Sequence, residues 1–358
     1  VRLRTGRRIT ALHAPDERGT RKRYERYENM RQTKTRMLAA GTALALLAGL
    51  ATACGSDSGN AADGTTGGSD TSTSDSSTSD TSAPESTEDT AAGGIDGTGK
   101  TITIPIASGW DEDVVVTALW QHVLQEKGFT VETPTLDIGP IFKGVATGDY
   151  DFFFDTWLPN THKDYWDEFG KDVDDIGVWY DNAPLTIAVP DYMDIDSMED
   201  LASIGDEVNK TITGIDPGAG LSRVTEEDMM PAYGLDDWEL KLSSTSAMLA
   251  ALKTATDNKE PIVVTLWKPH WAYGSFPIKD LADPKGAMGE PDEIHVIGSK
   301  SFTADNADVV EALSNFTISD DQLASLEVTV LKDHEDDPDA GLAEWIADNQ
   351  DYVDSLLG

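Results

Sequence analysis

The sequence predicts an α/β fold arranged in two lobes. From Lys100 onward, short runs of β-branched and aromatic residues alternate with longer segments of helical periodicity. This alternation occurs in two successive halves, each rich in βαβ units. The 358 residues are enough for two domains or for one two-lobed protein. We expect lobe 1 at residues 99–188 and 289–358, and lobe 2 at residues 189–288.

The first half alternates strand and helix. Residues 111–126 predict a helix, because Val115, Leu119 and Val123 fall on one face and acids occupy the first turn. Residues 150–157 (YDFFFDTW) are typical of a strand that ends in an aromatic residue. We expect the other strands at residues 101–107, 129–133, 176–180 and 184–189, and the other helices at residues 138–147 and 161–169.

The second half repeats the pattern. The turn at residues 216–220 (DPGAG) opens a helix that runs to Met230. Residues 262–267 predict a buried strand, since the run is short, β-branched and flanked by Pro261 and Pro269. We expect further strands at residues 211–215, 238–242 and 293–298, and helices at residues 197–204, 246–256, 304–315, 319–331 and 340–357.

The first 98 residues are expected to precede the folded body. Residues 30–53 are typical of an export signal, with a basic segment, an apolar run and small residues before Cys54, the single cysteine. LATAC at residues 50–54 resembles a bacterial lipobox, whose cysteine is lipidated. Residues 1–29 are interpreted as an extension upstream of a start at Met30, or alternatively as a long basic leader. Residues 54–98, rich in Ser, Thr, Gly and Asp, predict a disordered acidic tether.

Charge is unevenly distributed along the chain. Residues 1–36 hold 12 of the 27 basic residues and 4 of the 65 acidic ones, which leaves 15 basic and 61 acidic residues for the remainder. A body this acidic repels nucleic acid and anionic membrane surfaces. Solvation of a soluble surface is the simplest role for that charge.

Three tryptophans follow predicted strands, namely Trp110, Trp157 and Trp267. The loop after Trp157 carries Asn160 and His162, and the loop after Trp267 carries His270 and Trp271. Ligands of open α/β sheets bind at the carboxyl ends of strands. Converging indoles bind a quaternary ammonium group, which has no N–H to donate, at about 0.5–2 kcal/mol per ring. The sequence therefore predicts a shared aromatic cage, with packing in the core as the alternative.

A ligand that also carries a carboxylate needs donors. Gly218, Ala219 and Gly220 could offer backbone N–H groups at a helix N-terminus, although an ordinary tight turn explains the same residues. The helix that begins at Asp111 is a second such terminus, where the acids Asp111 and Glu112 compete with an anion; both belong to the candidate site. His270 could donate from its ring.

Several long motifs carry a family resemblance over residues 100–332. They are GWDED, GDYDFFFDTWLPNTHKDYW, PLTIAVPDYM, SMEDL, KTITGIDPGAG, SSTSAMLAAL, LWKPHW and DLADPKGAMG. In this order they resemble the substrate-binding protein of ABC transporters for glycine betaine, proline betaine and choline. The resemblance implies a periplasmic-binding-protein fold of type II, a two-lobed "Venus flytrap" that closes on its ligand.

The resemblance also implies roles for individual residues. Trp157 and Trp267 match cage positions, Trp110 matches the third wall of the choline-type branch, and His270 is expected to reach a carboxylate or line the cleft. Some betaine-binding relatives have a further tryptophan in the motif that matches SNFTISDD, where this chain has Phe316 and Ile318. Which quaternary amine is bound therefore stays open.

No catalytic motif competes with a binding role. The six histidines show no HExxH spacing, and the sequence contains no GxSxG motif. We expect no enzymatic activity and no cofactor or metal. The expected protein is a monomeric lipoprotein, anchored through Cys54 on the outer face of the cell membrane, that delivers glycine betaine to an ABC permease and ATPase. The alternatives are a choline or carnitine binder of the same fold, and a sensory or surface lipoprotein without a transporter.

Overall fold

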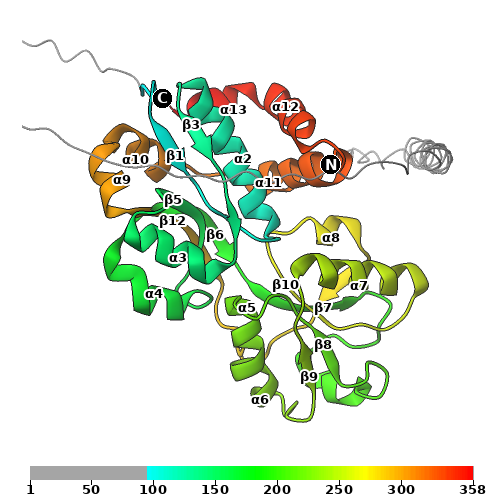
Figure 1. Cartoon of the computed structure of the whole chain (residues 1–358). Helices are drawn as coiled ribbons and strands as arrows, with labels where there is room; N and C mark the ends of the chain where they lie inside the picture. The colour runs from blue at the N-terminus through cyan, green and yellow to red at the C-terminus, as the bar shows by residue number, and fades with distance from the viewer. Residues whose placement is uncertain (1–94, 358) are drawn as a thin grey trace, which may run out of the picture. The chain divides into compact units, whose positions relative to one another are not determined.

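The computed structural model of the protein describes residues 95–357. The expected extension, export signal and Cys54, with residues 54–94 of the tether, lie outside the described residues. Within 95–357, no helix combines the length and the apolar character needed to cross a bilayer. These residues form two α/β lobes, which meet at a narrower region of the molecule (Figure 1).

Lobe 1 contains short parallel strand pairs and a three-stranded antiparallel sheet. Its strands are β1 (Thr101–Thr103), β2 (Ile106–Ala107), β3 (Thr130–Glu132), β4 (Thr135–Leu136), β5 (Phe152–Leu158), β6 (Val173–Ala183) and β12 (Asp292–Ser299). β1 pairs with β3 and β2 with β4, whereas β12 lies between β5 and β6. Its helices are α2 (Asp111–Glu126), α3 (Ile138–Thr147), α4 (Lys163–Phe169), α9 (Lys300–Asp305), α10 (Ala307–Ser314), α11 (Asp320–Glu327), α12 (Pro338–Asp348) and α13 (Gln350–Ser355), with short 3₁₀ and π segments at Gly170–Asp172 and Val328–Asp333.

Two helices of lobe 1, α2 and α3, have the bounds expected from the sequence. The single strand expected at residues 101–107 is wrong, because it is split into β1 and β2, which pair with different partners. Pro105 lies between them and has no N–H to continue a ladder. All seven residues of β5 are buried, so this strand forms the centre of the lobe 1 core.

Lobe 2 is built on one five-stranded sheet. Its strands are β7 (Leu185–Pro190), β8 (Thr211–Thr213), β9 (Glu239–Lys241), β10 (Val264–Trp267) and β11 (Ile278–Asp280), in the order β11-β7-β10-β8-β9. Its helices are the 3₁₀ helix at Met198–Ile204, α5 (Gly220–Arg223), which continues through a π segment (Val224–Met229) into α6 (Met230–Ala232), α7 (Thr245–Asn258) and α8 (Ala272–Ser275). The short elements β11 and α8 have no counterpart among the sequence predictions.

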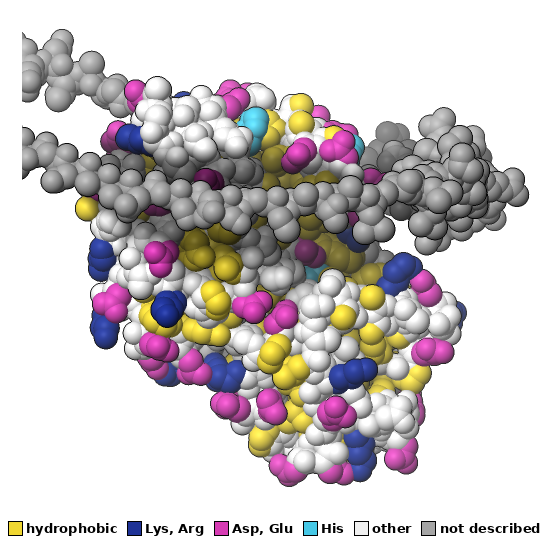
Figure 2. Space-filling view, viewed as in Figure 1, with side chains coloured by type: hydrophobic (Ala, Val, Ile, Leu, Met, Phe, Trp, Pro, Cys, Tyr) yellow, Lys and Arg dark blue, Asp and Glu magenta, His cyan; other side chains and the backbone are white. Residues whose placement is uncertain are grey.

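The chain passes between the lobes twice. The first crossing is at Pro184, between β6 and β7, and the second lies between β11 and β12. The boundary expected near residue 188 therefore falls inside β7, which belongs to the lobe 2 sheet. Acidic side chains are spread over the faces of both lobes that are visible in Figure 2.

The two lobes touch on both sides of the cleft between them. Hydrogen bonds between them run from Arg223 Nη2 to the Asn160 carbonyl at 3.0 Å, from Tyr165 Oη to the Gly218 carbonyl at 2.9 Å, and from Trp271 Nε1 to the Asp111 carboxylate. The Lys332 ammonium of lobe 1 also lies 3.8 Å from the centroid of a Trp271 ring. The structure is therefore a closed arrangement of the lobes.

Candidate functional site

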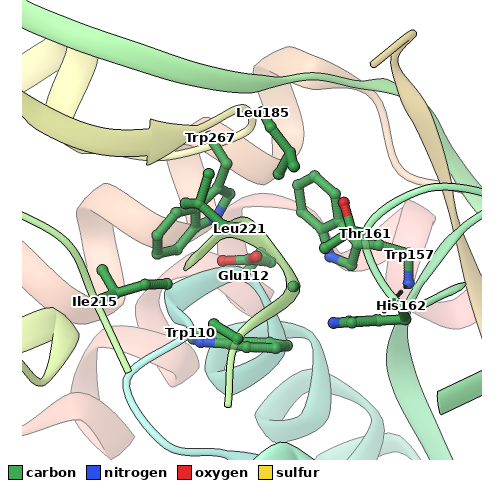
Figure 3. Close-up of a pocket in the computed structure, with 11 residues that line it drawn as sticks. Trp110, Glu112, Trp157, Thr161, His162, Leu185, Ile215, Leu221 and Trp267 are labelled. Carbon is green, nitrogen blue, oxygen red and sulfur yellow. Dashed lines mark hydrogen bonds between the residues drawn. The ribbon is translucent and has the colours of Figure 1, made fainter. Parts of the chain in front are cut away.

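A pocket with an empty volume of about 280 Å³ lies between the lobes (Figure 3). Its aromatic walls are Trp110, Trp157 and Trp267. Trp157 belongs to the carboxyl end of β5 and Trp267 to that of β10, whereas Trp110 precedes the first turn of α2. Lobe 1 therefore supplies two indoles and lobe 2 supplies the third. The structure brings together the three tryptophans that the sequence singled out.

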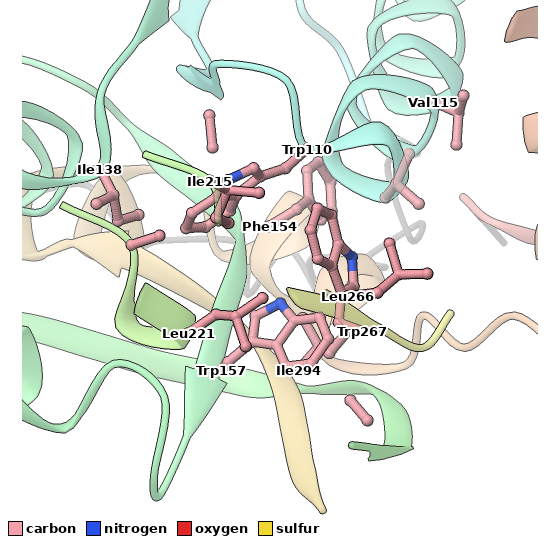
Figure 4. Packing of buried hydrophobic residues seen from close by; sticks show 14 of the residues in the cluster. Trp110, Val115, Ile138, Phe154, Trp157, Ile215, Leu221, Leu266, Trp267 and Ile294 are labelled. Carbon is pink, nitrogen blue, oxygen red and sulfur yellow. The ribbon is translucent and has the colours of Figure 1, made fainter. Parts of the chain in front are cut away.

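The three indoles are part of the packed interior. Their exposed fractions are 8% for Trp110, 3% for Trp157 and 4% for Trp267. Figure 4 shows them beside the apolar side chains of both lobes, Leu221 among them. Trp110 stacks on His162, with ring centroids 5.4 Å apart and planes inclined by 7°. Rings held in this way form a rigid, dry wall that can face a cation without reorganising.

His162 lines the pocket and is the main functional residue that the site prediction left out. Its Nδ1 accepts a hydrogen bond from the backbone N–H of Trp157 at 2.9 Å, so the ring proton of the neutral form is on Nε2. Nε2 has no partner within the described residues, and it points toward the pocket (Figure 3). Burial, together with the charge of Arg223, lowers the pKa of His162 to about 3. His162 is thus a neutral N–H donor to the pocket.

Backbone N–H groups of lobe 2 supply further donors. Gly220 and Leu221 open α5 and line the pocket, and as the first two helical residues they have no intrahelical acceptor. The Ala219 N–H instead donates to the Asp216 carbonyl at 3.1 Å, although Ala219 also lines the pocket. Gly218 lies in a neighbouring cleft. Of the predicted DPGAG donors, Gly220 is therefore the one that fits an anionic group.

Glu112 is the acidic residue of the pocket wall. It is 1% exposed, and its Oε2 has no hydrogen-bond partner among the described residues. Burial, and then the nearby carboxyls of Asp155 and Glu327, raise the pKa of Glu112 well above its ordinary value. A cation in the cage would compensate this buried carboxylate.

Three other predicted site residues lie off the pocket wall. His270 packs edge-on against Trp267, with ring centroids 4.7 Å apart, and its Nδ1 accepts from the Ala272 N–H at 3.0 Å. Asp111 accepts from Trp271. The backbone N–H of Asn160 donates to Asp292 at 2.7 Å. These three residues support the cage and the contact between lobes.

The motif that holds a further tryptophan in some relatives contributes no cage wall here. Phe316 is 2% exposed and packs in the lobe 1 core against Trp120 and Trp179, at ring-centroid distances of 5.3 and 5.7 Å. Ile318 is 6% exposed and lies outside the pocket lining. Trp110 occupies the third wall instead.

The chain has two α/β lobes that are joined by two crossings and closed around an aromatic pocket. This arrangement is typical of two-lobed solute-binding proteins. The family described as the substrate-binding domain of ABC-type glycine betaine transport systems (OpuAC) matches residues 100–348. The chain belongs to this family, which is one of transporter binding domains and not of enzymes.

Individual relatives agree with this assignment. The chain is 39% identical over 152 residues to the glycine betaine/carnitine transport binding protein GbuC of Listeria monocytogenes; the match covers 42% of this chain and about half, 50%, of that protein. Lactococcal OpuAC, solved in its closed form with glycine betaine, is 35% identical, with a TM-score of 0.67 over 72% of this chain and 100% of that one. A glycine betaine/L-proline-binding protein (ProX) of Borrelia burgdorferi is 29% identical, with a TM-score of 0.68 over 72% of this chain and 97% of that one.

Proposed function

We propose that this chain captures glycine betaine outside the cytoplasm and delivers it to an ABC importer. The observation that carries the proposal is that two kinds of chemical group line the pocket. Three indoles and Glu112 suit a trimethylammonium group, while His162 and the Gly220 and Leu221 amides suit a carboxylate. Three rings would contribute a few kcal/mol, a sizeable share of the about 8 kcal/mol of a micromolar affinity.

Family membership supports the rest of the proposal. A binding domain of this family works with a membrane permease and an ATPase. We propose that Cys54 is lipidated, that residues 54–98 tether the body to the outer face of the membrane, and that the protein is a monomer. Choline is the second candidate ligand, because the free Glu112 Oε2 can accept a hydrogen bond from its hydroxyl.

Titration of the purified protein with glycine betaine, proline betaine, carnitine and choline tests the proposal. Tryptophan fluorescence and calorimetry report binding, and we expect a micromolar Kd for glycine betaine, about 8 kcal/mol. If none of the four ligands binds more tightly than about 1 mM, or roughly 4 kcal/mol, the proposed function is wrong.

His162→Asn is expected to weaken glycine betaine binding by about tenfold or more. The asparagine oxygen can still accept the Trp157 N–H, but the donor at Nε2 is lost. A hydrogen bond to a charged group contributes about 1.5–3 kcal/mol, and each 1.4 kcal/mol is a factor of ten in Kd. Choline, which has no carboxylate, is the control ligand and should bind the variant as it binds the wild type. An equal loss for both ligands would show that His162 serves the cage and not the carboxylate.

A further inference from the structure

Asp155 is an acid in the middle of a fully buried strand. It is 0% exposed, and its neighbours along β5 are phenylalanines on one side and Thr156 and Trp157 on the other. Within the described residues no Lys, Arg or His forms an ion pair with it, and its Oδ2 has no hydrogen-bond partner. Burying an acid without a basic partner costs several kcal/mol. Packing alone gives no reason for an acid at this position.

The Oδ1 atom of Asp155 connects this acid to the cage. It accepts the indole N–H of Trp157 at 2.6 Å, and the indole is a wall of the pocket. A hydrogen bond to a carboxylate is short and strong, so it fixes the orientation of the ring. It also moves electron density into the indole, which makes the ring face more negative and strengthens its attraction for a cation.

Other acids lie around the same point. Glu112 and Asp113 of α2 both have their pKa raised by burial and then by the charge of Asp155, and Glu327 of α11 acts on Glu112. Glu112 is the member of this group that reaches the pocket wall. Of these acids, Glu112 borders the pocket directly and Asp155 borders it through the Trp157 indole, and within the described residues neither is paired with a basic side chain. The positive charge of a bound ligand would therefore compensate these two carboxyl groups.

We propose that Asp155 is a positioning residue for cation recognition. It orients and polarises the Trp157 indole and, with Glu112, makes the pocket prefer a quaternary ammonium over an uncharged isostere of the same shape. This inference rests on the proposed function, since it concerns how the same cage selects its ligand.

The test compares each cation with its carbon isostere, in which C(CH₃)₃ replaces N(CH₃)₃. The pairs are glycine betaine with 3,3-dimethylbutanoate, and choline with 3,3-dimethylbutan-1-ol. We expect Asp155→Asn to lower the cation-to-isostere ratio of affinities by about tenfold, which corresponds to about 1.4 kcal/mol. Affinity for the isostere should stay within about threefold of the wild-type value. An unchanged ratio overturns the inference, whereas failure of the wild type to bind either cation overturns the proposed function.

Asp113→Asn is the matched control. Asp113 is also an acid with 0% exposure, but it accepts from the Ala107 N–H at 2.6 Å and the Thr117 hydroxyl at 3.1 Å, whereas the Trp157 indole donates to Asp155. Its removal takes away a buried charge of the same kind without touching the cage. We expect the ratio to stay within about threefold of the wild type. A loss equal to that of Asp155→Asn would mean that the effect is general and would overturn the role of Asp155.

A pH series on the wild type tests the same point without a variant. Burial raises the pKa of Asp155 to about 7, against the effect of the Trp157 hydrogen bond. A bound cation favours the ionised form and the isostere does not, so the ratio should rise as the pH increases from 5 to 9.

The other groups that face Asp155 decide how the pH series is analysed. Glu112, Asp113 and Glu327 also have raised pKa values and also become more negative as the pH increases. His162 stays neutral over this pH range. His295 of β12 lies beside Thr156, on the opposite face of β5, where it pairs with Asp175. The increase of the affinity ratio with pH should be smaller in Asp155→Asn than in the wild type, and the difference measures the contribution of Asp155. A flat wild-type ratio contradicts the inference.

Discussion

Gly220→Ala is expected to prevent full closure of the lobes and to weaken glycine betaine binding by about 100-fold. A Cβ at this position would lie 1.9 Å from the carbonyl oxygen and 2.6 Å from the carbonyl carbon of Thr161, which belongs to the other lobe. Those atoms are backbone and cannot rotate away. Overpacking costs about 1–3 kcal/mol, and each 1.4 kcal/mol is a factor of ten. Alanine is otherwise a good residue for the first turn of α5, so each lobe should fold normally.

Gly218→Ala is the matched control for closure. Its Cβ would lie 3.6 Å from the Tyr165 hydroxyl and 3.8 Å from Ile138 Cγ2, which are ordinary contacts. Calorimetry gives the affinities, and small-angle scattering with and without glycine betaine gives the change in radius of gyration. We expect wild type and Gly218→Ala to become more compact with ligand, and Gly220→Ala to remain extended. Tight binding and normal compaction by Gly220→Ala would mean that closure does not need this contact.

Much of the framework could be predicted because it depends on local pattern. The α2 helix follows from apolar residues on one face and acids in its first turn, and its bounds are those expected. The positions of Trp157 and Trp267 follow from strand ends, since β5 and β10 deliver both side chains to one cleft. The end of a strand can be recognised in the sequence. The edge of the sheet at which that strand ends then determines where its last side chain lies.

The choice between two histidines could not be predicted in the same way. His162 and His270 each follow a tryptophan within a few residues, and both are buried with a lowered pKa. They differ in what their Nε2 atoms face: that of His162 faces the pocket, whereas that of His270 lies 3.9 Å from Asp111, behind Trp267. This difference depends on the chain direction after each strand, which tertiary packing sets. The DTWLPNTH loop places His162 in the same candidate stretch as Trp157 and Asn160, but the sequence does not distinguish which polar residue of the loop lines the pocket.

Asp155, unlike the predicted site residue Glu112, could not be identified from the sequence. Asp155 interrupts a run of aromatic residues, a pattern that also fits a strand with one exposed position. The structure instead buries every residue of β5 and places this carboxyl against a cage indole. A polar residue in a strand becomes informative only when both faces of the sheet are known to be covered.

Trp267→Leu is expected to weaken glycine betaine binding by about 30-fold. Trp267 is the one cage indole that lobe 2 supplies, so its loss opens the wall that closes over the ligand. Loss of a desolvated cation–π contact accounts for about 2 kcal/mol, which is roughly 30-fold in Kd. Leucine keeps an apolar side chain against His270 and so limits the loss of packing. Calorimetric titration with glycine betaine measures the change, and thermal unfolding shows whether the fold is kept.

Trp345→Leu is the control for losing a buried tryptophan. Trp345 is 3% exposed on α12, where its Nε1 donates to Ser325 at 2.8 Å, and it lies outside the pocket lining. Both variants should lower the unfolding temperature, but only Trp267→Leu should raise the Kd. If Trp267→Leu bound glycine betaine as tightly as the wild type, the ligand would have to occupy another part of the cleft. Since the other two indoles and His162 all belong to lobe 1, such a result would also remove lobe 2 from direct recognition of the cation and leave it only the carboxylate.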